Sequence, residues 1–196
     1  QALVKDKRFD GLLYLLPAAQ TSDKLSISPE QMHKLVTELK QDFDYIIIDC
    51  PAGIEQGYKN AVAGADKAIV VTTPEKTAVR DADRIIGLLE KEEHIESPKL
   101  VINRIRGHMM NNGEMLDIDE ITTFLSIDLI GIIVDDDHVI KASNQGEPIV
   151  LDPNNEASIA YRNIARRILG ESIPLKPIET QPTGMFSKIK KLIGVK

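Results

Sequence analysis

The sequence is short of cysteine and aromatic residues, and it contains no long hydrophobic run. A single cysteine, Cys50, excludes an internal disulfide framework and a cysteine-rich metal site, and it favours a reducing compartment such as the cytoplasm. Apolar runs such as residues 129–134 have the length of a core strand, well below the roughly 20 residues that cross a bilayer. The first residues contain no initiator methionine and no signal-peptide pattern, so we interpret Gln1 as a cut edge.

Basic residues are fewer than acidic ones. The 24 Lys and Arg against 30 Asp and Glu leave a formal net charge of −6, which argues against a nucleic-acid binder that relies on global positive charge. The remaining composition, 42% hydrophobic and 28% charged, is typical of a soluble globular protein. A length of 196 residues fits one α/β domain or a domain with a tail.

A phosphate-binding loop is the next feature that the sequence lacks. None of the 12 glycines is followed by lysine, so neither the standard glycine-rich loop nor a variant ending in Gly-Lys-Ser/Thr is present. A complete nucleotide site needs such a loop with its lysine. The chain is therefore either a fragment or a protein without ATP chemistry.

Short aliphatic runs alternate with segments of helical spacing. The runs cover residues 12–16, 45–48, 68–71, 100–102 and 129–134. Uninterrupted apolar strands between helices indicate a mostly parallel sheet with helices on both faces. The sequence therefore predicts an α/β fold.

Helix starts and stops are marked by capping residues. Ser28, Pro29 and Gln31 form a start signal with a capping box ahead of an apolar stripe that ends at Leu39. A second helix is expected over residues 79–89, and a third opens at Asp117-x-x-Glu120. A last helix runs from Glu156 to Leu169, where Gly170 ends it.

A proline-rich stretch separates the end of the predicted domain from the carboxyl terminus. We expect the domain to cover residues 1–170, a semi-rigid linker residues 171–184, and an amphipathic helix residues 185–196. Residues 184–196 carry four lysines and no acid, which gives +4, whereas residues 1–183 carry 20 basic and 30 acidic residues, which gives −10.

The terminal helix combines an apolar face with lysines. Its proposed membrane-contacting residues are Met185, Phe186, Lys188, Ile189, Lys190, Lys191, Leu192 and Ile193. This pattern is typical of an interfacial anchor that binds an anionic membrane surface reversibly, and the alternative is a helix that docks on its own domain or on a partner. Dimerisation would join two weak anchors and strengthen membrane binding.

An acidic residue follows the apolar run 45–48. Asp49 ends this run and leads into a loop with Pro51 and Gly53. Ligands of open parallel sheets lie beyond the carboxyl ends of strands, where a carboxylate can hold Mg²⁺ directly or through water. An aspartate that caps the next helix is the alternative. The charge of Asp49 disfavours a thiolate at Cys50, which we expect to be a small core residue.

Four motifs in order resemble a known family. They are Asp49-Cys-Pro-Ala-Gly-Ile-Glu55, Thr73-Pro-Glu75 with the helix at 79–84, Ala142-Ser-Asn-Gln-Gly-Glu-Pro148, and the basic amphipathic tail. Together they resemble the MinD/ParA family of deviant-Walker P-loop ATPases over nearly the whole chain. The tail and the motif at 142–148 favour the septum-placing branch of that family.

The resemblance implies roles for individual residues. Asp49 matches the residue linked to Mg²⁺, and Ala52 and Gly53 match the switch loop that senses the γ-phosphate of ATP. Asn103 matches the asparagine at the adenine, with a plain strand-ending residue as the alternative. Asp135 and Asp136 align with a nucleotide-contacting loop, although an acidic loop is usually solvated. The resemblance also implies that about 60 residues, with the signature lysine, precede Gln1.

The resemblance further implies an activity and partners. It suggests an ATPase that forms a homodimer with ATP and Mg²⁺, binds the inner face of the membrane, recruits a MinC-like division inhibitor and is released by a MinE-like or equivalent regulator. Arg80, Asp81 and Asp83 match its partner surface, although ion-paired helix charges are the default interpretation. The chain itself is expected to be inactive alone. The alternatives are a non-catalytic membrane-binding module and a ParA-like or flagellar-number ATPase.

Overall fold

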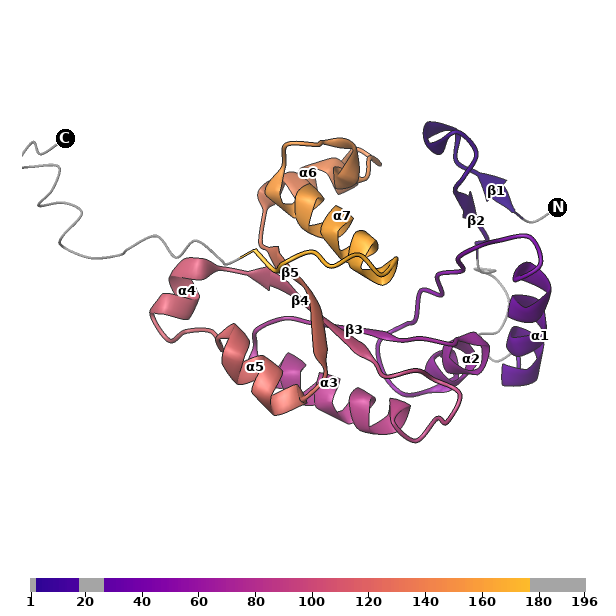
Figure 1. Ribbon diagram of the computed structural model, residues 1–196, viewed down its shortest axis with the longest axis horizontal. Coiled ribbons are helices and arrows are strands. Elements are labelled where there is room, and N and C mark those ends of the chain that lie inside the picture. Colours follow the sequence, from indigo (N-terminus) through magenta and orange to yellow (C-terminus); the bar gives the residue numbers. More distant parts are fainter. Residues whose placement is uncertain (1–2, 18–26, 177–196) are drawn as a thin grey trace, which may run out of the picture. The chain divides into compact units, whose positions relative to one another are not determined.

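The computed structural model describes residues 3–17 and 27–176, and it divides the chain into two compact units, residues 1–65 and 66–196 (Figure 1). We describe each unit by itself. The linker residues 177–184 and the predicted helix 185–196 lie outside the described residues, so the membrane-contacting residues remain a prediction. None of the helices in the described residues has both the length and the apolar character needed to cross a bilayer.

Unit 1 contains a hairpin and two helices. The elements are β1 (Val4–Lys5), a 3-10 helix (Lys7–Phe9), β2 (Tyr14–Leu15), α1 (Pro29–Leu39) and α2 (Gln56–Gly64). β1 and β2 pair antiparallel, with Val4 opposite Leu15. The run 12–16 therefore does not join a parallel sheet as predicted. Asp10 and Gly11 both adopt positive φ, 48° and 77°, and this turn folds the run back on the preceding strand.

The start of α1 confirms the predicted capping box. The Oγ of Ser28 accepts a hydrogen bond from the backbone N–H of Gln31, and the Gln31 side chain accepts one from the Ser28 N–H. Val36 is buried against α2, where a Cβ on Gly64 would lie 2.8 Å from its Cγ2. The close approach of α1 and α2 therefore depends on a glycine.

The predicted strand at residues 45–48 is not a strand in the structure. Tyr45 is 65% exposed and Ile47 is 93% exposed. A strand forms only where a neighbouring strand takes its backbone hydrogen bonds, and no strand among the described residues of unit 1 pairs with this run. The apolar pattern alone could not reveal this missing neighbour.

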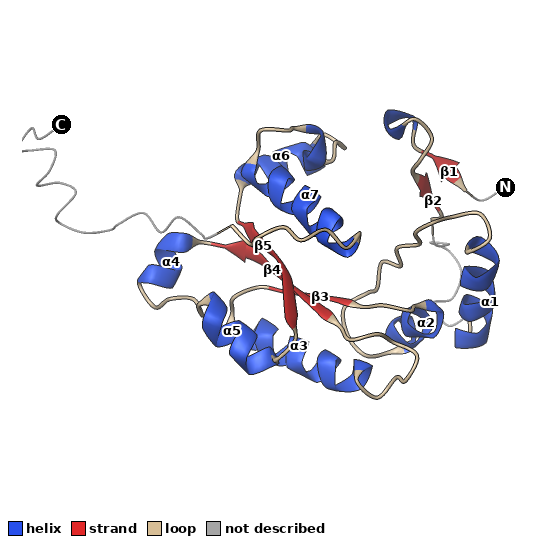
Figure 2. Ribbon diagram, in the orientation of Figure 1, coloured by secondary structure: helices blue, strands red, loops and turns tan. Residues whose placement is uncertain are grey.

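Unit 2 confirms the α/β prediction (Figure 2). Its parallel sheet has the order β3-β4-β5, formed by β3 (Ile69–Thr72), β4 (Lys99–Ile105) and β5 (Asp128–Val134). Its helices are α3 (Lys76–Leu89), α4 (Gly107–Asn111), α5 (Ile118–Leu125), α6 (Asp137–Asn144) and α7 (Glu156–Ile168), with a 3-10 helix at Ile149–Leu151. The capping box of Asp117 and Glu120 is present, and Gly170 follows α7 with φ +90°.

The core of unit 2 lies on both faces of the sheet. Val101 and Ile133 pack with Ala157 and Ile164 on the α7 face. On that face a Cβ on Gly131 would overlap Ile164. Residues alternate between faces along a strand, so the fully buried Leu100 and Ile102 point to the opposite side, where Figure 2 shows α3 and α5.

A strap of residues 171–176 follows α7 and turns back along it. The guanidinium of Arg167 donates hydrogen bonds to the carbonyl oxygens of Ile173 and Pro174, and to that of Ile130 in the edge strand β5, at 2.8–2.9 Å. Lys176 then forms an ion pair of 2.8 Å with Glu156, at the beginning of α7. Arg167 therefore joins the helix, the strap and the sheet edge.

Candidate nucleotide site

The loop after residue 48 in unit 1 is built for a close backbone approach. Gly53 has φ +100°, a left-handed conformation that favours glycine, and a Cβ there would meet nothing within 4 Å. A Cβ on Gly57 would overlap the ring of Pro51, so the loop rests on the first turn of α2. Glu55, the residue before α2, makes no side-chain cap. The Glu55 side chain therefore does not occupy the beginning of α2.

Asp49 lies at the start of this loop and is exposed. Its carboxylate makes no hydrogen bond or ion pair to the described residues, so it is available to a ligand, and its link to Mg²⁺ stays a prediction. Within residues 3–17 and 27–176, no cluster of three or more His, Cys, Asp or Glu side chains could hold a metal ion. The loop thus offers a single carboxylate beside an open glycine, which fits Mg²⁺ shared with a phosphate.

Cys50 is exposed, so the prediction of a core residue is wrong. The reason is the missing strand pairing of residues 45–48, which leaves the following positions without a covering layer. Partial burial of the thiol, and then the neighbouring charge of Asp49, raise the pKa of Cys50. The expected suppression of the thiolate is therefore confirmed.

In unit 2 the pairing of β4 with β5 is irregular near the carboxyl end of β4, where Arg104 and Arg106 lie. Ile102 pairs with Ile132 and Ile105 with Val134, so β4 holds one residue more than β5 over this stretch. Arg104 lies within the irregularity and has φ +60°. Just after Arg104, the carbonyl of Ile105 accepts a hydrogen bond of 2.9 Å from the backbone N–H of Asp135 in the loop that follows β5.

Asp135 binds both arginines at this edge. Its carboxylate accepts from the Nε of Arg106 at 2.6 Å and lies 3.4 Å from the Nε of Arg104. The Arg106 hydrogen bond, followed by that of Arg104, holds the pKa of Asp135 below its usual range against the effect of burial. Asp135 is thus compensated by the protein's own cations, unlike the solvated acid of the alternative interpretation.

Asp136 joins two helices. One oxygen accepts from the backbone N–H of His138 at 2.8 Å and caps α6, while the other accepts from the Nδ2 of Asn155 at 2.6 Å. Asn155 in turn caps α7 through the N–H of Ser158. Burial alone would raise the pKa of Asp136, but these hydrogen bonds outweigh it and the pKa is lowered. Both carboxylate oxygens of Asp136 therefore already accept hydrogen bonds from the protein itself.

Asn103 lies half-buried at the end of β4. Its Oδ1 accepts from the N–H of Arg104 at 2.9 Å, and its Nδ2 makes no hydrogen bond to the described residues. A hollow of about 480 Å³ lies at the same edge, beside Arg106 and Asp135, and reaches Arg167 and Leu175. The free amide donor keeps Asn103 a candidate for contacting a base edge.

The structure places the predicted residues in two groups. Asp49, Ala52 and Gly53 belong to unit 1, whereas Asn103, Asp135 and Asp136 lie at one edge of the sheet in unit 2. Arg104, Arg106 and Asn155 were missed. Alternation along β4, which puts residues 104 and 106 on one side, and an asparagine just before a helical pattern were the available signals.

The predicted partner surface on α3 is open. Arg80, Asp81 and Asp83 are exposed, and none of them forms an ion pair with another residue of the described chain. The alternative interpretation, in which these helix charges form ion pairs within the protein, is therefore not supported by the described residues. These side chains remain available to a partner.

Comparisons with known proteins identify a family. The family model described as "ParA: NUBPL iron-transfer P-loop NTPase" matches residues 26–169. The septum site-determining protein MinD of Bacillus subtilis is 74% identical over 196 residues, which cover 100% of this chain and 73% of that protein. The solved MinD of Aquifex aeolicus is 47% identical with a TM-score of 0.80, covering 89% of this chain and 71% of that one. The Aquifex MinC:MinD complex matches at 46% identity and a TM-score of 0.81, covering 90% and 70%.

Proposed function

This chain belongs to the ParA family of P-loop NTPases, in its MinD branch, and we propose that it acts in placing the division septum through an ATP-driven cycle on the membrane. The observation that carries the proposal is the 74% identity to the septum site-determining protein of Bacillus subtilis along all 196 residues. The open loop at Asp49–Gly53 and the free amide of Asn103 are consistent with it.

We propose nucleotide contacts for residues in each unit, taken separately. Asp49 would hold Mg²⁺ through water, and Ala52, Gly53 and the first turn of α2 would contact the γ-phosphate. Asn103 would contact the adenine, and Asp135 and Asp136 would shape the neighbouring loop. ATP with Mg²⁺ supplies the phosphoryl group whose hydrolysis resets the cycle. The chain's residues bind and orient it.

The partner and membrane steps are also part of the proposal. With ATP bound the protein forms a homodimer, and two copies of residues 185–196 then bind an anionic membrane together. Arg80, Asp81 and Asp83 contribute to binding a MinC-like inhibitor, in line with the solved MinC:MinD complex of the Aquifex relative. A MinE-like or equivalent regulator stimulates hydrolysis and returns the protein to the cytoplasm.

A second candidate function rests on one sequence observation. No glycine in the 196 residues is followed by lysine, so the chain alone lacks a phosphate-binding lysine loop. A non-catalytic membrane-binding module would need none. We accordingly expect no Mg²⁺-dependent phosphate release from purified 1–196, and measurable turnover would contradict this expectation.

The coding DNA upstream of Gln1 separates the two candidates. An in-frame extension that encodes Gly-Lys-Gly-Gly-x-Gly-Lys-Thr would support the ATPase, and Asp49→Ala and Asn103→Ala in the extended protein should then abolish hydrolysis and weaken ATP binding, respectively. Thr123→Ala, on the exposed face of α5, is the control that leaves both unchanged. A start codon just before Gln1, with no such loop, would leave the membrane-binding module.

A further inference from the structure

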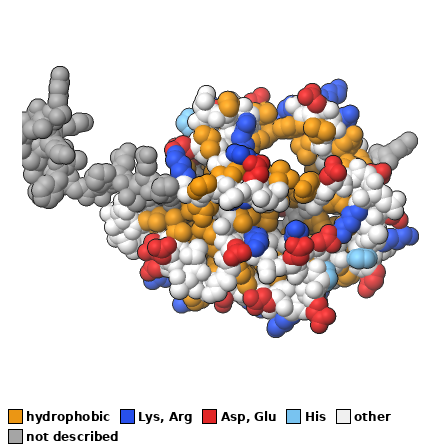
Figure 3. All heavy atoms as spheres, in the orientation of Figure 1, with side chains coloured by type: hydrophobic (Ala, Val, Ile, Leu, Met, Phe, Trp, Pro, Cys, Tyr) orange, Lys and Arg blue, Asp and Glu red, His pale blue; other side chains and the backbone are white. Residues whose placement is uncertain are grey.

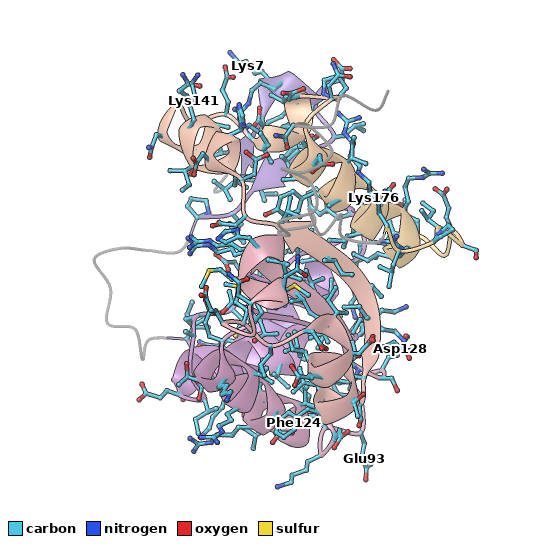
Figure 4. All side chains as sticks on the ribbon, turned by 90° about the vertical axis from the view of Figure 1, so that its left-hand side faces the viewer. Lys7, Glu93, Phe124, Asp128, Lys141 and Lys176 are labelled. Atoms are coloured by element: carbon cyan, nitrogen blue, oxygen red, sulfur yellow. The ribbon has the colours of Figure 1, made fainter. Side chains whose placement is uncertain are left out.

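The carboxyl-terminal half of α3 and the end of α5 enclose a surface hollow of about 530 Å³ in unit 2. Phe124 lies at its edge and is 55% exposed, and Figure 4 labels it on the outer surface. Gly87 also lines the hollow. An exposed aromatic ring beside a glycine on a helix surface offers apolar contact area and room for a close approach.

No packing contact among the described residues requires glycine at position 87. It lies inside α3, where glycine is less favourable than alanine by about 1 kcal/mol. A Cβ at this position would meet nothing within 4 Å, so no neighbour requires its absence. Gly131 shows the contrast, because a Cβ there would overlap Ile164. A glycine that the fold does not need is explained if another molecule approaches α3 at this point.

Charged residues flank Gly87 in two rows of opposite sign. At about 100° per residue, Asp83 and Glu90 lie within about 20° of each other, Arg84 and Lys91 form a second row about 100° further round, and Gly87 lies between the rows. Glu90 and Lys91 form the turn directly after α3, where the N–H of Glu90 donates to the carbonyl of Ile86 and that of Lys91 to the carbonyl of Leu88, so both residues stay close to the path of the helix. None of the four charges forms an ion pair within the described residues, and Figure 3 shows charges of both signs along the edge where α3 and α5 lie.

This arrangement is complementary to a second copy of itself. When two copies of α3 lie parallel across a two-fold axis, the acidic row of one faces the basic row of the other on both sides, as in parallel coiled coils. Asp83 then lies opposite the second copy's Arg84, and Glu90 opposite the second copy's Lys91. In an antiparallel pair the acidic rows would face each other and repel.

We propose that the α3 surface centred on Gly87 binds a second copy of this chain in a parallel, two-fold symmetric contact. Glycine at the centre lets the helices approach, the two charge rows set their direction, and Phe124 adds apolar area at the rim. The contact uses no nucleotide and is separate from the ATP-dependent homodimer proposed above. We expect the association to be weak in solution and to become effective where copies are concentrated on a surface.

Exchanging Glu90 and Lys91 tests the charge rows. Sedimentation velocity of the full 196-residue chain, in low salt without nucleotide, should show concentration-dependent dimers. Glu90→Lys alone and Lys91→Glu alone should each raise the dissociation constant about tenfold, because each places like charges opposite one another on both sides. The double variant, which restores opposite charges, should return within about threefold of the original.

Glu93→Lys is the matched control, since it makes the same charge change at an exposed residue that does not line the hollow (labelled in Figure 4). It should leave the dissociation constant unchanged. A monomer at every concentration would overturn the proposal. So would a double variant as weak as the single variants, or a control as weak as Glu90→Lys.

A crosslink tests the position of the axis independently. In a Cys50→Ser background, Gly87→Cys should form a disulfide-linked dimer within minutes of mild oxidation, because the two thiols meet at the axis. Ala165→Cys, on the exposed face of α7, should not. Circular dichroism of each variant checks that it is folded. Equal crosslinking at both positions, or none at residue 87 in a folded variant, would overturn the proposal.

Discussion

Asp135 is neutralised by guanidinium groups before any ligand arrives, whereas Asp49 makes no hydrogen bond or ion pair to the described residues. The two aspartates therefore have different capacities, although both follow an aliphatic run in the sequence. A compensated carboxylate fixes the end of β4 to the loop after β5, and a free one is the better cation ligand. The resemblance implied nucleotide contacts for both. Alternation along β4 places Arg104 and Arg106 on one side, but it does not show that the irregular end of this strand brings them to Asp135.

Replacing Asp135 tests its role through pH. Its folded pKa is lowered, so its contribution to stability is complete above the unfolded pKa of about 4 and is lost as pH falls through the folded value. Asp135→Asn should reduce the free energy of unfolding by about 1–3 kcal/mol at neutral pH. In urea titrations the difference from the parent should shrink below about pH 4. A difference that stays constant with pH would contradict the ion-pair assignment.

Gly87 predicts a gain in stability. Gly87→Ala should raise the free energy of unfolding by about 0.5–1 kcal/mol in dilute solution, because alanine is the better helix former and nothing occupies the space. Gly131→Ala is the control in the same unit. There the new methyl group would overlap Ile164, so urea denaturation should show a loss of about 1–3 kcal/mol. A loss at Gly87 would mean that the fold itself needs this glycine.

Among the elements, helices followed their local signals and two strands did not. Ser28 and Asp117 mark helix starts that the structure confirms, because a capping box is made within a few residues of sequence. The runs at 12–16 and 45–48 have the same apolar character as β4. They lack its position between two neighbours, and a neighbour elsewhere in the chain decides whether an apolar run becomes a paired strand.

Asn155 connects α7 to the loop after β5. Asn155→Ala removes the cap of α7 and the hydrogen bond to Asp136, so we expect a loss of about 1–2 kcal/mol in the free energy of unfolding. Asn154→Ala removes a neighbouring exposed amide with neither role and should change stability by less than about 0.5 kcal/mol. If thermal or urea unfolding showed the same loss of stability for both variants, Asn155 would have no capping role.

The strap depends on Arg167. Arg167→Ala removes hydrogen bonds to two strap carbonyls and to Ile130, so the strap should open more often. Cleavage after Glu171 by a glutamate-specific protease should become at least about tenfold faster. Arg162→Ala is the control, because Arg162 binds the carbonyl of Val150 and does not touch the strap. Unchanged cleavage in Arg167→Ala would show that other contacts hold this segment.

For the whole molecule, the sequence predicted the layered α/β arrangement of unit 2, its helices α3, α5 and α7, and the family, but it did not predict α4 or α6. Those features depend on patterns repeated along many residues. The site was predicted less completely, because Asp49 and Gly53 lie in one unit and Asn103 and Asp135 in another. Roles such as that of Asn155 require contacts between segments far apart in sequence. The charge contrast is a property of the whole chain, because residues 184–196 carry a net charge of +4 and residues 1–183 carry a net charge of −10.

This charge difference predicts selective membrane binding. Co-sedimentation with vesicles should show the full chain binding anionic phospholipid weakly and neutral phospholipid far less, with the anionic binding falling as salt rises. Removing residues 185–196 should abolish it. Replacing Ile189 and Ile193 by Ser, with all lysines kept, should also lower it at least about tenfold, because the apolar face contributes beside the charges. Binding that survives the deletion would assign the membrane contact to another part of the chain.

The strap also determines how the protein carries a mechanical load. A pull applied beyond Lys176 reaches Glu156 at the first turn of α7, and it reaches Arg167 and the backbone of β5 near the last turn. Such a pull therefore meets contacts at both ends of the helix and at the edge of the sheet. A chain held at residue 176 would resist forces that peel a helix open from its last turn.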